Sequence, residues 1–164
     1  MTSRSCFFTG HRNAPSDSLL VIKTGTLIID LITKCGVTDF YAGGAVGWDM
    51  ICEKIILDLK EKYPKIKLHL VLPCPPEIQT TKWNSKQIEE YNRILNSADD
   101  VEIVSEKYET DCMKKRNARL VKYGDICICY YNEKNSRSGT GQTVRMAQKA
   151  GKPIANMYDY LDFF

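Results

Sequence analysis

Short apolar runs alternate with longer amphipathic segments along almost the whole chain. The apolar runs are typical of strands buried on both faces, and the longer segments repeat apolar residues at helical spacing. Strands separated by crossover helices pair in parallel, since tight hairpins join only antiparallel strands. The sequence therefore predicts an α/β fold of three layers, with a mostly parallel sheet and helices on both of its faces.

The expected elements follow one another without internal repeats. Asp17 or Ser16 is the expected cap of the first helix, whose apolar side would carry Leu19, Ile22, Leu27 and Leu31. Residues 73–84 are the one long irregular stretch and form a candidate lid. Strands are expected at 6–9, 39–42, 68–72, 101–104, 125–131 and 154–157. Helices are expected at 18–34, 47–63, 85–97 and 139–150, and a further helix should run from a cap at Thr110 or Asp111 to Lys122.

Length and composition indicate one globular domain spanning residues 1–164. The net charge of +3 is small and evenly spread, so nucleic acid is an unlikely main partner. No run approaches the ~20 apolar residues of a membrane span, and the first residues do not resemble a signal peptide. Seven cysteines in irregular spacing predict reduced thiols in the cytoplasm, with no metal site. Cys127 and Cys129 should share one face of a strand.

Small residues follow three of the predicted strands at the point where each strand ends. In an open parallel sheet, ligands bind beyond the carboxyl ends of the strands, so these turns should meet at one edge. Glycine allows a phosphate to approach the free amides at a helix N-terminus, where the helix dipole also favours an anion. A single glycine turn can also be an ordinary chain reversal, but the three turns together favour a ligand site. The arrangement predicts a Rossmann-like anion site built from Thr9, Gly10, His11, Arg12, Gly43, Gly44, Gly47, Asp49, Gly139, Thr140, Gly141, Gln142 and Thr143.

A basic helical stretch adds two further candidates. Arg116 lies three residues after Met113, so it borders the apolar side of its helix and can point into a cleft. Asn117 follows it directly. We expect both residues to contribute to the same ligand site.

The motifs resemble those of the SLOG superfamily, the Rossmann-like group that contains the DNA-processing protein DprA and the LOG enzymes. The similarity is greatest to its YpsA-like branch. The matching segments are TGHR at 9–12, GGAVGWD at 43–49, LVLPCP at 70–75, CMKKRN at 112–117 and SGTGQTVRMA at 138–147, together with Trp83. The resemblance implies a nucleoside phosphate or an ADP-ribose-like small molecule as the ligand, no separate cofactor, and a tendency to form a homo-oligomer.

LOG enzymes cleave the N-glycosidic bond of nucleoside monophosphates with an arginine and a glutamate. Arg116 matches their arginine, but Thr143 stands where their glutamate is expected. Threonine cannot stabilise the oxocarbenium-like charge that develops when this bond breaks. A catalytic role would therefore fall to Asp49 or Glu53, which share a helical face. Alternatively, Asp49 can complement the helix dipole or bind a ribose hydroxyl, and Glu53 can be an ordinary acidic residue of the helix.

The sequence leaves three functional hypotheses. The leading one is a binding module that senses or sequesters a nucleotide-derived ligand. The second is a nucleoside phosphate N-glycosidase that uses Asp49 or Glu53. The third, weaker one is single-stranded DNA binding as in DprA, although no basic strip with aromatic residues is present.

Overall fold

The computed structural model describes residues 4–162. Its strands form one sheet in the order β4-β3-β2-β1-β5-β6, and each neighbouring pair is parallel. The predicted three-layer, Rossmann-like α/β fold is confirmed. The strands are β1 (Arg4–Gly10), β2 (Val37–Ala42), β3 (Lys67–Leu72), β4 (Asp100–Ile103), β5 (Ile126–Tyr130) and β6 (Ile154–Asn156).

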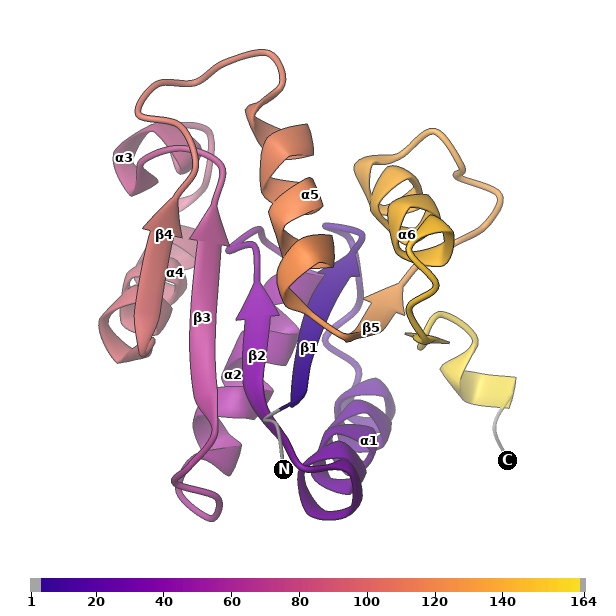
Figure 1. Ribbon diagram of the computed structural model, residues 1–164. Helices are drawn as coiled ribbons and strands as arrows, with labels where there is room; N and C mark the ends of the chain where they lie inside the picture. Colours follow the sequence, from indigo (N-terminus) through magenta and orange to yellow (C-terminus); the bar gives the residue numbers. More distant parts are fainter. Residues whose placement is uncertain (1–3, 163–164) are drawn as a thin grey trace.

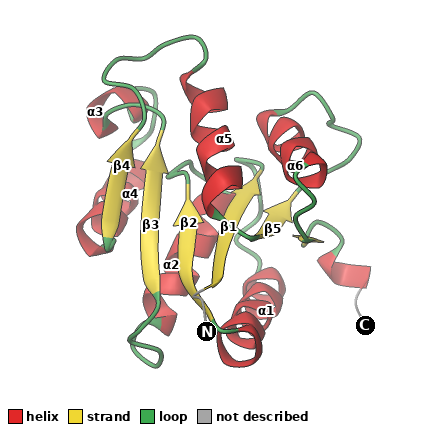
Figure 2. Ribbon diagram, in the orientation of Figure 1, coloured by secondary structure: helices red, strands yellow, loops and turns green. Residues whose placement is uncertain are grey.

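Helices cover both faces of the sheet (Figures 1 and 2). One face carries α1 (Ser18–Cys35), α2 (Trp48–Leu59) and α4 (Ser85–Ser97), and the other carries α5 (Cys112–Tyr123) and α6 (Gly139–Lys149). The short helix α3 (Pro76–Gln79) follows β3, and the 3-10 turn η1 (Tyr160–Asp162) follows β6. Within residues 4–162, no helix combines the length and the apolar character that crossing a bilayer requires.

The strand order contains one reversal of direction. The chain builds the sheet outward from β1 to β4 and then returns to place β5 on the other side of β1. The connections that follow β1 and β5 therefore leave toward opposite faces of the sheet (Figure 1). Such a switch point opens a crevice beyond the carboxyl ends of the two strands.

Two apolar clusters fill the spaces between the layers. Phe8 and Trp48 belong to the cluster under α1, α2 and α4, whereas Phe7 belongs to the cluster under α5 and α6. Consecutive residues of a strand point to opposite faces, which explains how Phe7 and Phe8 serve different layers. Cys127 and Cys129 both lie in the second cluster, so the prediction that they share one face is confirmed.

One prediction for α1 is wrong. Asp17 caps this helix as expected, because its carboxylate accepts hydrogen bonds from the amides of Leu19 and Leu20. Of the four residues expected on its apolar side, Leu19, Leu27 and Leu31 pack against the core, but Ile22 is 64% exposed. The fully buried residues of α1 are Leu20, Thr24 and Ile28. Apolar residues occur on most sides of this helix, so the pattern alone does not decide which side meets the sheet.

Two further boundaries differ from the sequence predictions, whereas the start of α5 lies at Asp111 as expected. Residues 73–84 are not irregular throughout, because Pro75 and Pro76 begin the helical turn α3. The predicted helix 47–63 ends as α2 at Leu59 and continues only as hydrogen-bonded turns. Asp111 occupies the N-cap position of α5, but its side chain forms an ion pair with Lys115 instead of capping the helix.

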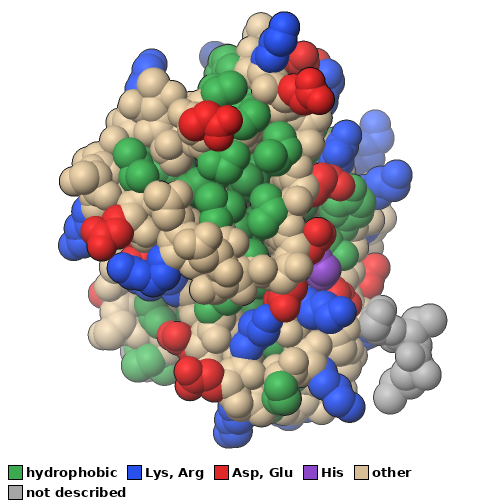
Figure 3. Space-filling model, turned by 90° about the vertical axis from the view of Figure 1, so that its left-hand side faces the viewer, with side chains coloured by type: hydrophobic (Ala, Val, Ile, Leu, Met, Phe, Trp, Pro, Cys, Tyr) green, Lys and Arg blue, Asp and Glu red, His purple; other side chains and the backbone are tan. Residues whose placement is uncertain are grey.

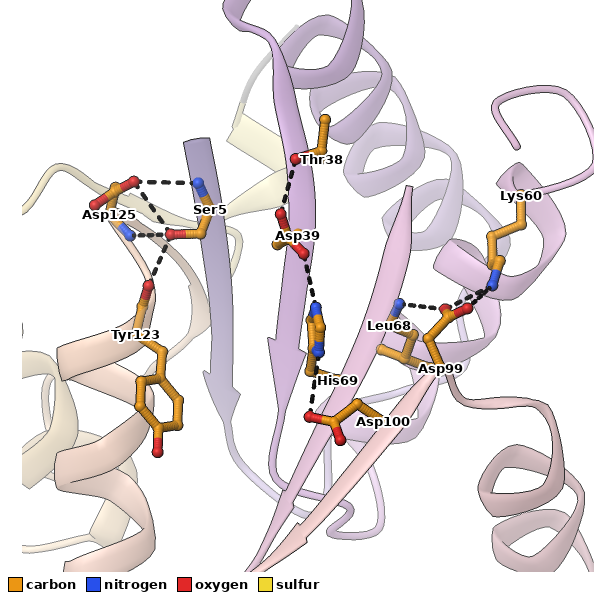
Figure 4. Close-up of polar contacts among 10 residues, drawn as sticks. All are labelled: Ser5, Thr38, Asp39, Lys60, Leu68, His69, Asp99, Asp100, Tyr123 and Asp125. Carbon is orange, nitrogen blue, oxygen red and sulfur yellow. Dashed lines mark hydrogen bonds and ion pairs between the residues drawn. The ribbon is translucent and has the colours of Figure 1, made fainter. Parts of the chain in front are cut away.

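Polar contacts join the strands far from the crevice (Figure 4). The Nε2 atom of His69 lies 2.7 Å from Oδ1 of Asp39, and its Nδ1 atom lies 3.4 Å from Oδ2 of Asp100. The hydroxyl of Ser5 donates to the carbonyl of Tyr123 at 2.7 Å. These residues lie in or next to the amino-terminal halves of strands and at the end of α5, so they fix the sheet without reaching its carboxyl edge.

Strand β4 forms one edge of the sheet. Figure 3 views the molecule from this side and shows hydrophobic side chains gathered there. Val101 and Ile103 of the edge strand are 39% and 44% exposed. The acidic side chains of Asp100 and Glu102 alternate with them and contact His69 and Arg119, respectively.

Candidate functional site

A pocket of about 290 Å³ opens at the switch point between β1 and β5. The end of β1 and the turn after it form one side, α5 forms another, and the start of α6 closes the third. Nine residues that the sequence singled out as candidates line this pocket. They are Thr9, Gly10, His11, Arg12, Asp49, Arg116, Asn117, Gly139 and Thr140.

The N-terminus of α6 presents free backbone donors to the pocket. The hydroxyl of Ser138 caps the helix by accepting a hydrogen bond from the amide of Gly141 at 3.0 Å. The amides of Gly139 and Thr140 have no hydrogen-bond partner among residues 4–162. A Cβ atom at Gly139 would meet nothing nearer than Asn117, 4.0 Å away. This end of the helix is therefore both open and electropositive, as an anion site requires.

A buried arginine contributes a full positive charge to the same pocket. Arg116 is 7% exposed, and its guanidinium donates hydrogen bonds to Oδ1 of Asn117 and to the carbonyl of Gly43. These contacts hold the side chain in one orientation. Burial lowers the pKa of Arg116, and the attraction of Asp49 opposes this shift. Because the ordinary pKa of arginine is so high, the group remains a cation at neutral pH.

Asp49 supplies the negative charge opposite this arginine. It lies in the first turn of α2 and accepts a hydrogen bond from the amide of Ala45 at 3.1 Å. Burial raises the pKa of its carboxyl group, while Arg116 and the hydrogen bond from Ala45 lower it. Asp49 is the one acidic side chain among the described residues that line the pocket.

Glu53 lies one helical turn beyond Asp49 and outside the pocket lining. It is 1% exposed, and neither carboxyl oxygen has a hydrogen-bond partner among the described residues. Burial, and then repulsion by Asp49, raise the pKa of Glu53 well above its ordinary value. An isolated buried carboxylate is costly, so the protonated form is favoured.

His11 connects the two sides of the pocket. Its Nε2 atom accepts a hydrogen bond from the amide of Asn132 at 2.9 Å, so this nitrogen carries no proton. Its backbone carbonyl accepts a hydrogen bond from the amide of Trp48 at 3.2 Å. Burial lowers the pKa of the imidazole, which favours the neutral form that this contact requires. His11 thus holds the loop that leads to Ser138 and α6.

Two glycines serve close packing around the pocket. A Cβ atom at Gly10 would lie 2.3 Å from the ring of Trp48. Gly47 has a φ of 81°, and a Cβ atom there would lie 2.2 Å from the carbonyl oxygen of Arg12. The turns after β1 and β2 therefore pack directly on each other. In this respect the sequence argument was incomplete, because it considered the approach of a ligand or an ordinary chain reversal and not close packing between the turns.

Six predicted ligand residues lie outside the pocket lining. Gly43 is covered by Arg116, Gly44 by Leu72, and Gly141 by the carbonyl of Ser136. The hydroxyl of Thr143 bonds to the carbonyl of Gly139 within α6. The residues that the structure does not bring to the lining are Gly43, Gly44, Gly47, Gly141, Gln142 and Thr143.

Sequence reasoning missed five residues that border the pocket, namely Phe8, Ala45, Met113, Leu120 and Ser138, of which Phe8 and Leu120 belong to the apolar core. Ser138 had a usable signal, because serine directly before a helical segment is a preferred N-cap. Met113 entered the sequence argument only as an apolar reference point for Arg116. Ala45 has no chemical signal of its own, since it contributes its backbone amide to Asp49.

The fold defines a Rossmann-like α/β protein with a pocket at its topological switch point. The chain belongs to the YspA SLOG family, whose model matches residues 15–163. The predicted membership of the SLOG superfamily, in its YpsA-like branch, is thereby confirmed.

Several known proteins are similar to this chain. The SPbeta prophage-derived protein YoqJ of Bacillus subtilis (strain 168) is 31% identical over 145 residues, which cover 81% of this chain and 80% of YoqJ. The UPF0398 protein SH1465 of Staphylococcus haemolyticus is 29% identical over 97 residues, or 58% of this chain and 51% of that protein.

A solved structure shares the fold. DNA processing protein A from Helicobacter pylori, described for its single-stranded DNA binding mode, superimposes with a TM-score of 0.64 at 22% identity. The match covers 93% of this chain and 64% of that chain. The relationship shows a common fold, and the solved protein contains a substantial part that has no counterpart here.

Proposed function

We propose that this protein binds the phosphate group of a nucleotide or nucleotide-derived molecule at the N-terminus of α6, as a sensor or sequestering module. The observation that carries the proposal is the pair of amides at Gly139 and Thr140, which have no hydrogen-bond partner in the described part of the chain and share a pocket with the buried cation of Arg116. The hydroxyl group of Thr140 lies at the same helix end and can add a donor.

The expected affinity follows from the number of donors. Each hydrogen bond to a charged group contributes roughly 1.5–3 kcal/mol. Three or four such bonds together contribute about 5–12 kcal/mol, a range that includes the ~8 kcal/mol of micromolar binding. A pocket near 290 Å³ suits a phosphate with its attached sugar.

Isothermal titration calorimetry of the purified protein tests the proposal directly. The ligands are AMP, ADP-ribose, NAD and cyclic AMP, and native mass spectrometry of the same preparation reveals any molecule retained from the cell. We expect micromolar binding of at least one of them, with salt sensitivity from the charged contacts. If none binds and none is retained, the protein has no nucleotide role of this kind.

A second candidate function is hydrolysis of an N-glycosidic bond. The position of Asp49 makes it a better candidate than Glu53 for the catalytic carboxylate. Asp49 lines the pocket together with Arg116, whereas Glu53 does not. Chromatography after incubation with AMP would detect free adenine. Release that persists in Glu53→Gln but disappears in Asp49→Asn would support the hypothesis, and no release by the wild type would end it.

The single-stranded DNA hypothesis has less support. The Helicobacter structure supplies a fold at 22% identity, and the chain has a net charge of only +3. A gel shift with single-stranded DNA that weakens steeply with salt would revive this hypothesis.

We also propose that the protein acts in the cytoplasm. Its cysteines are free thiols, and six of the seven are buried. Reduced cysteines persist in compartments that glutathione keeps reducing. Fractionation of cells that express the protein would locate it.

A further inference from the structure

A second hollow adjoins the pocket at the switch point. It has a volume of about 670 Å³ and is bordered by residues 74–87 and by Tyr108 in the loop before α5. It shares Arg12 and Met113 with the first pocket. We propose that this hollow, here called the base groove, holds the aromatic base of the molecule whose phosphate group lies at α6. This inference rests on the proposed function and narrows the ligand to a nucleotide that keeps its base.

Aromatic side chains border the base groove. The ring of Trp83 lies edge-on to that of Tyr91, with 5.1 Å between the ring centres. Tyr108 is 64% exposed, although a tyrosine ring is largely apolar. Exposed aromatic rings beside a nucleotide site are suited to stacking on a base, because every base has a π-face.

The wall that carries Trp83 is held in place by polar contacts. The hydroxyl of Tyr91 donates to Oε1 of Gln79 at 2.8 Å, and Nε2 of Gln79 donates to the carbonyl of Gly44 at 3.4 Å. Asn84 and Gln87 form a reciprocal capping box at the start of α4, directly after Trp83. This wall of the groove is thus connected to the turn after β2, and the wall is already ordered when a ligand arrives.

The junction of the two hollows is positively charged. The side chain of Arg12 borders both and makes no hydrogen bond or ion pair within residues 4–162. Lys82 borders the groove as well, and none of its described lining residues is acidic. A guanidinium between a phosphate site and an aromatic groove matches the chemistry of a nucleotide, in which a sugar phosphate is linked to a base.

The volumes agree with this division. Small-molecule sites in proteins usually span about 300–1,000 Å³. The first pocket, at about 290 Å³, lies at the lower limit of that range. Together with the base groove, the site has room for a complete nucleotide.

Calorimetric titration with two probes separates the two parts of the site. Ribose 5-phosphate carries the phosphate and sugar alone, and AMP adds the base. We expect AMP to bind roughly 5- to 100-fold more tightly, which is the range that stacking of one base supplies. Tyr108→Ala should remove much of this gain and leave the affinity for ribose 5-phosphate unchanged. Tyr108→Phe keeps the ring and serves as the matched control.

Tryptophan fluorescence provides an independent readout. The chain has two tryptophans, and Trp48 is fully buried beneath Gly10. AMP should therefore change the emission of Trp83, whereas ribose 5-phosphate should not. Trp83→Phe should abolish the change.

The outcomes distinguish this inference from the proposed function. If ribose 5-phosphate and AMP bind equally well, the base groove assignment is wrong while phosphate binding stands. The same conclusion follows if Tyr108→Ala does not alter AMP affinity and AMP leaves the emission of Trp83 unchanged. If neither probe binds, the proposed function fails and the inference fails with it. Displacement of AMP by a short single-stranded oligothymidylate at concentrations below those of AMP would overturn the assignment to a free nucleotide.

Discussion

Replacing Gly139 by aspartate puts a negative charge beside the two unpartnered amides of α6. The substitution is sterically mild, because the nearest atom to a Cβ at this position is Nδ2 of Asn117 at 4.0 Å. The backbone of Gly139 has no positive φ, so a side chain adds no strain. Any loss of binding by Gly139→Asp should therefore arise from charge and from occupation of the anion site.

The size of the effect can be estimated from Coulomb's law. Two like charges at about 4 Å repel by about 1 kcal/mol in water and about 4 kcal/mol at an effective dielectric constant near 20. A phosphate bound beside the new carboxylate should thus lose about 5- to 1,000-fold in affinity, since 1.4 kcal/mol corresponds to a factor of ten. The same carboxylate should stabilise the free protein by about 0.3–1 kcal/mol, because it complements the helix dipole.

Two measurements on the same variants test this reasoning. Calorimetry gives the affinity for AMP, and urea unfolding gives the free energy of unfolding. Gly139→Asn, which has nearly the same shape without the charge, is the control and should bind far better than Gly139→Asp. If both variants bind AMP within twofold of the wild type, the phosphate does not lie at the start of α6 and the site has been placed wrongly.

Three further predictions concern the residues around the pocket. Gly10→Ala should lower the free energy of unfolding by about 1–3 kcal/mol in urea titrations, because its methyl group would overlap the ring of Trp48. A free energy of unfolding equal to that of the wild type would contradict the packing role. Because burial holds the pKa of Glu53 well above its ordinary 4.5, the folded state keeps a proton that the unfolded state releases, and stability should fall as pH rises above 4.5. Glu53→Gln should remove that part of the slope in unfolding experiments between pH 5 and pH 8, and an unchanged slope would count against it. Protonation of His11 would set a donor against the amide of Asn132. Because burial lowers the pKa of His11 from its ordinary 6.5, the hydrogen-exchange protection factors of residues 132–138, which correct for the intrinsic pH dependence of exchange, should fall only below pH 6.5. Equal protection factors at pH 7.5 and pH 5 would refute this.

The sequence predicted the architecture well because a parallel α/β fold follows from local patterns. Apolar runs and helical repeats identified the order of the elements, and parallel strands necessarily end at the same edge. This rule was enough to bring together residues as distant as Thr9, Asp49 and Gly139. It failed where several sides of an element look alike, as in α1, whose Ile22 points to solvent.

The base groove could not be predicted in the same way. Its walls come from residues 74–87 and from the loop around Tyr108, and neither segment has the periodicity that locates an element. The sequence marked residues 73–84 as a loop that could cover the site. What places Trp83 beside the pocket is the chain of contacts through Tyr91 and Gln79 to Gly44. Contacts of this kind depend on the packed structure and leave no local signature.

The glycines show why a motif can point to the right place for an incomplete reason. Glycine is required both where a ligand approaches the backbone and where another part of the protein does, and the sequence does not distinguish the two. Gly10 and Gly47 lie against Trp48 and Arg12, whereas Gly139 faces open space. Substitution at the first two should therefore act on stability, and substitution at Gly139 should act on binding. We expect Gly139→Ala to leave the free energy of unfolding unchanged and Gly10→Ala to lower it. This difference would separate the residues that build the pocket from the one that receives the anion.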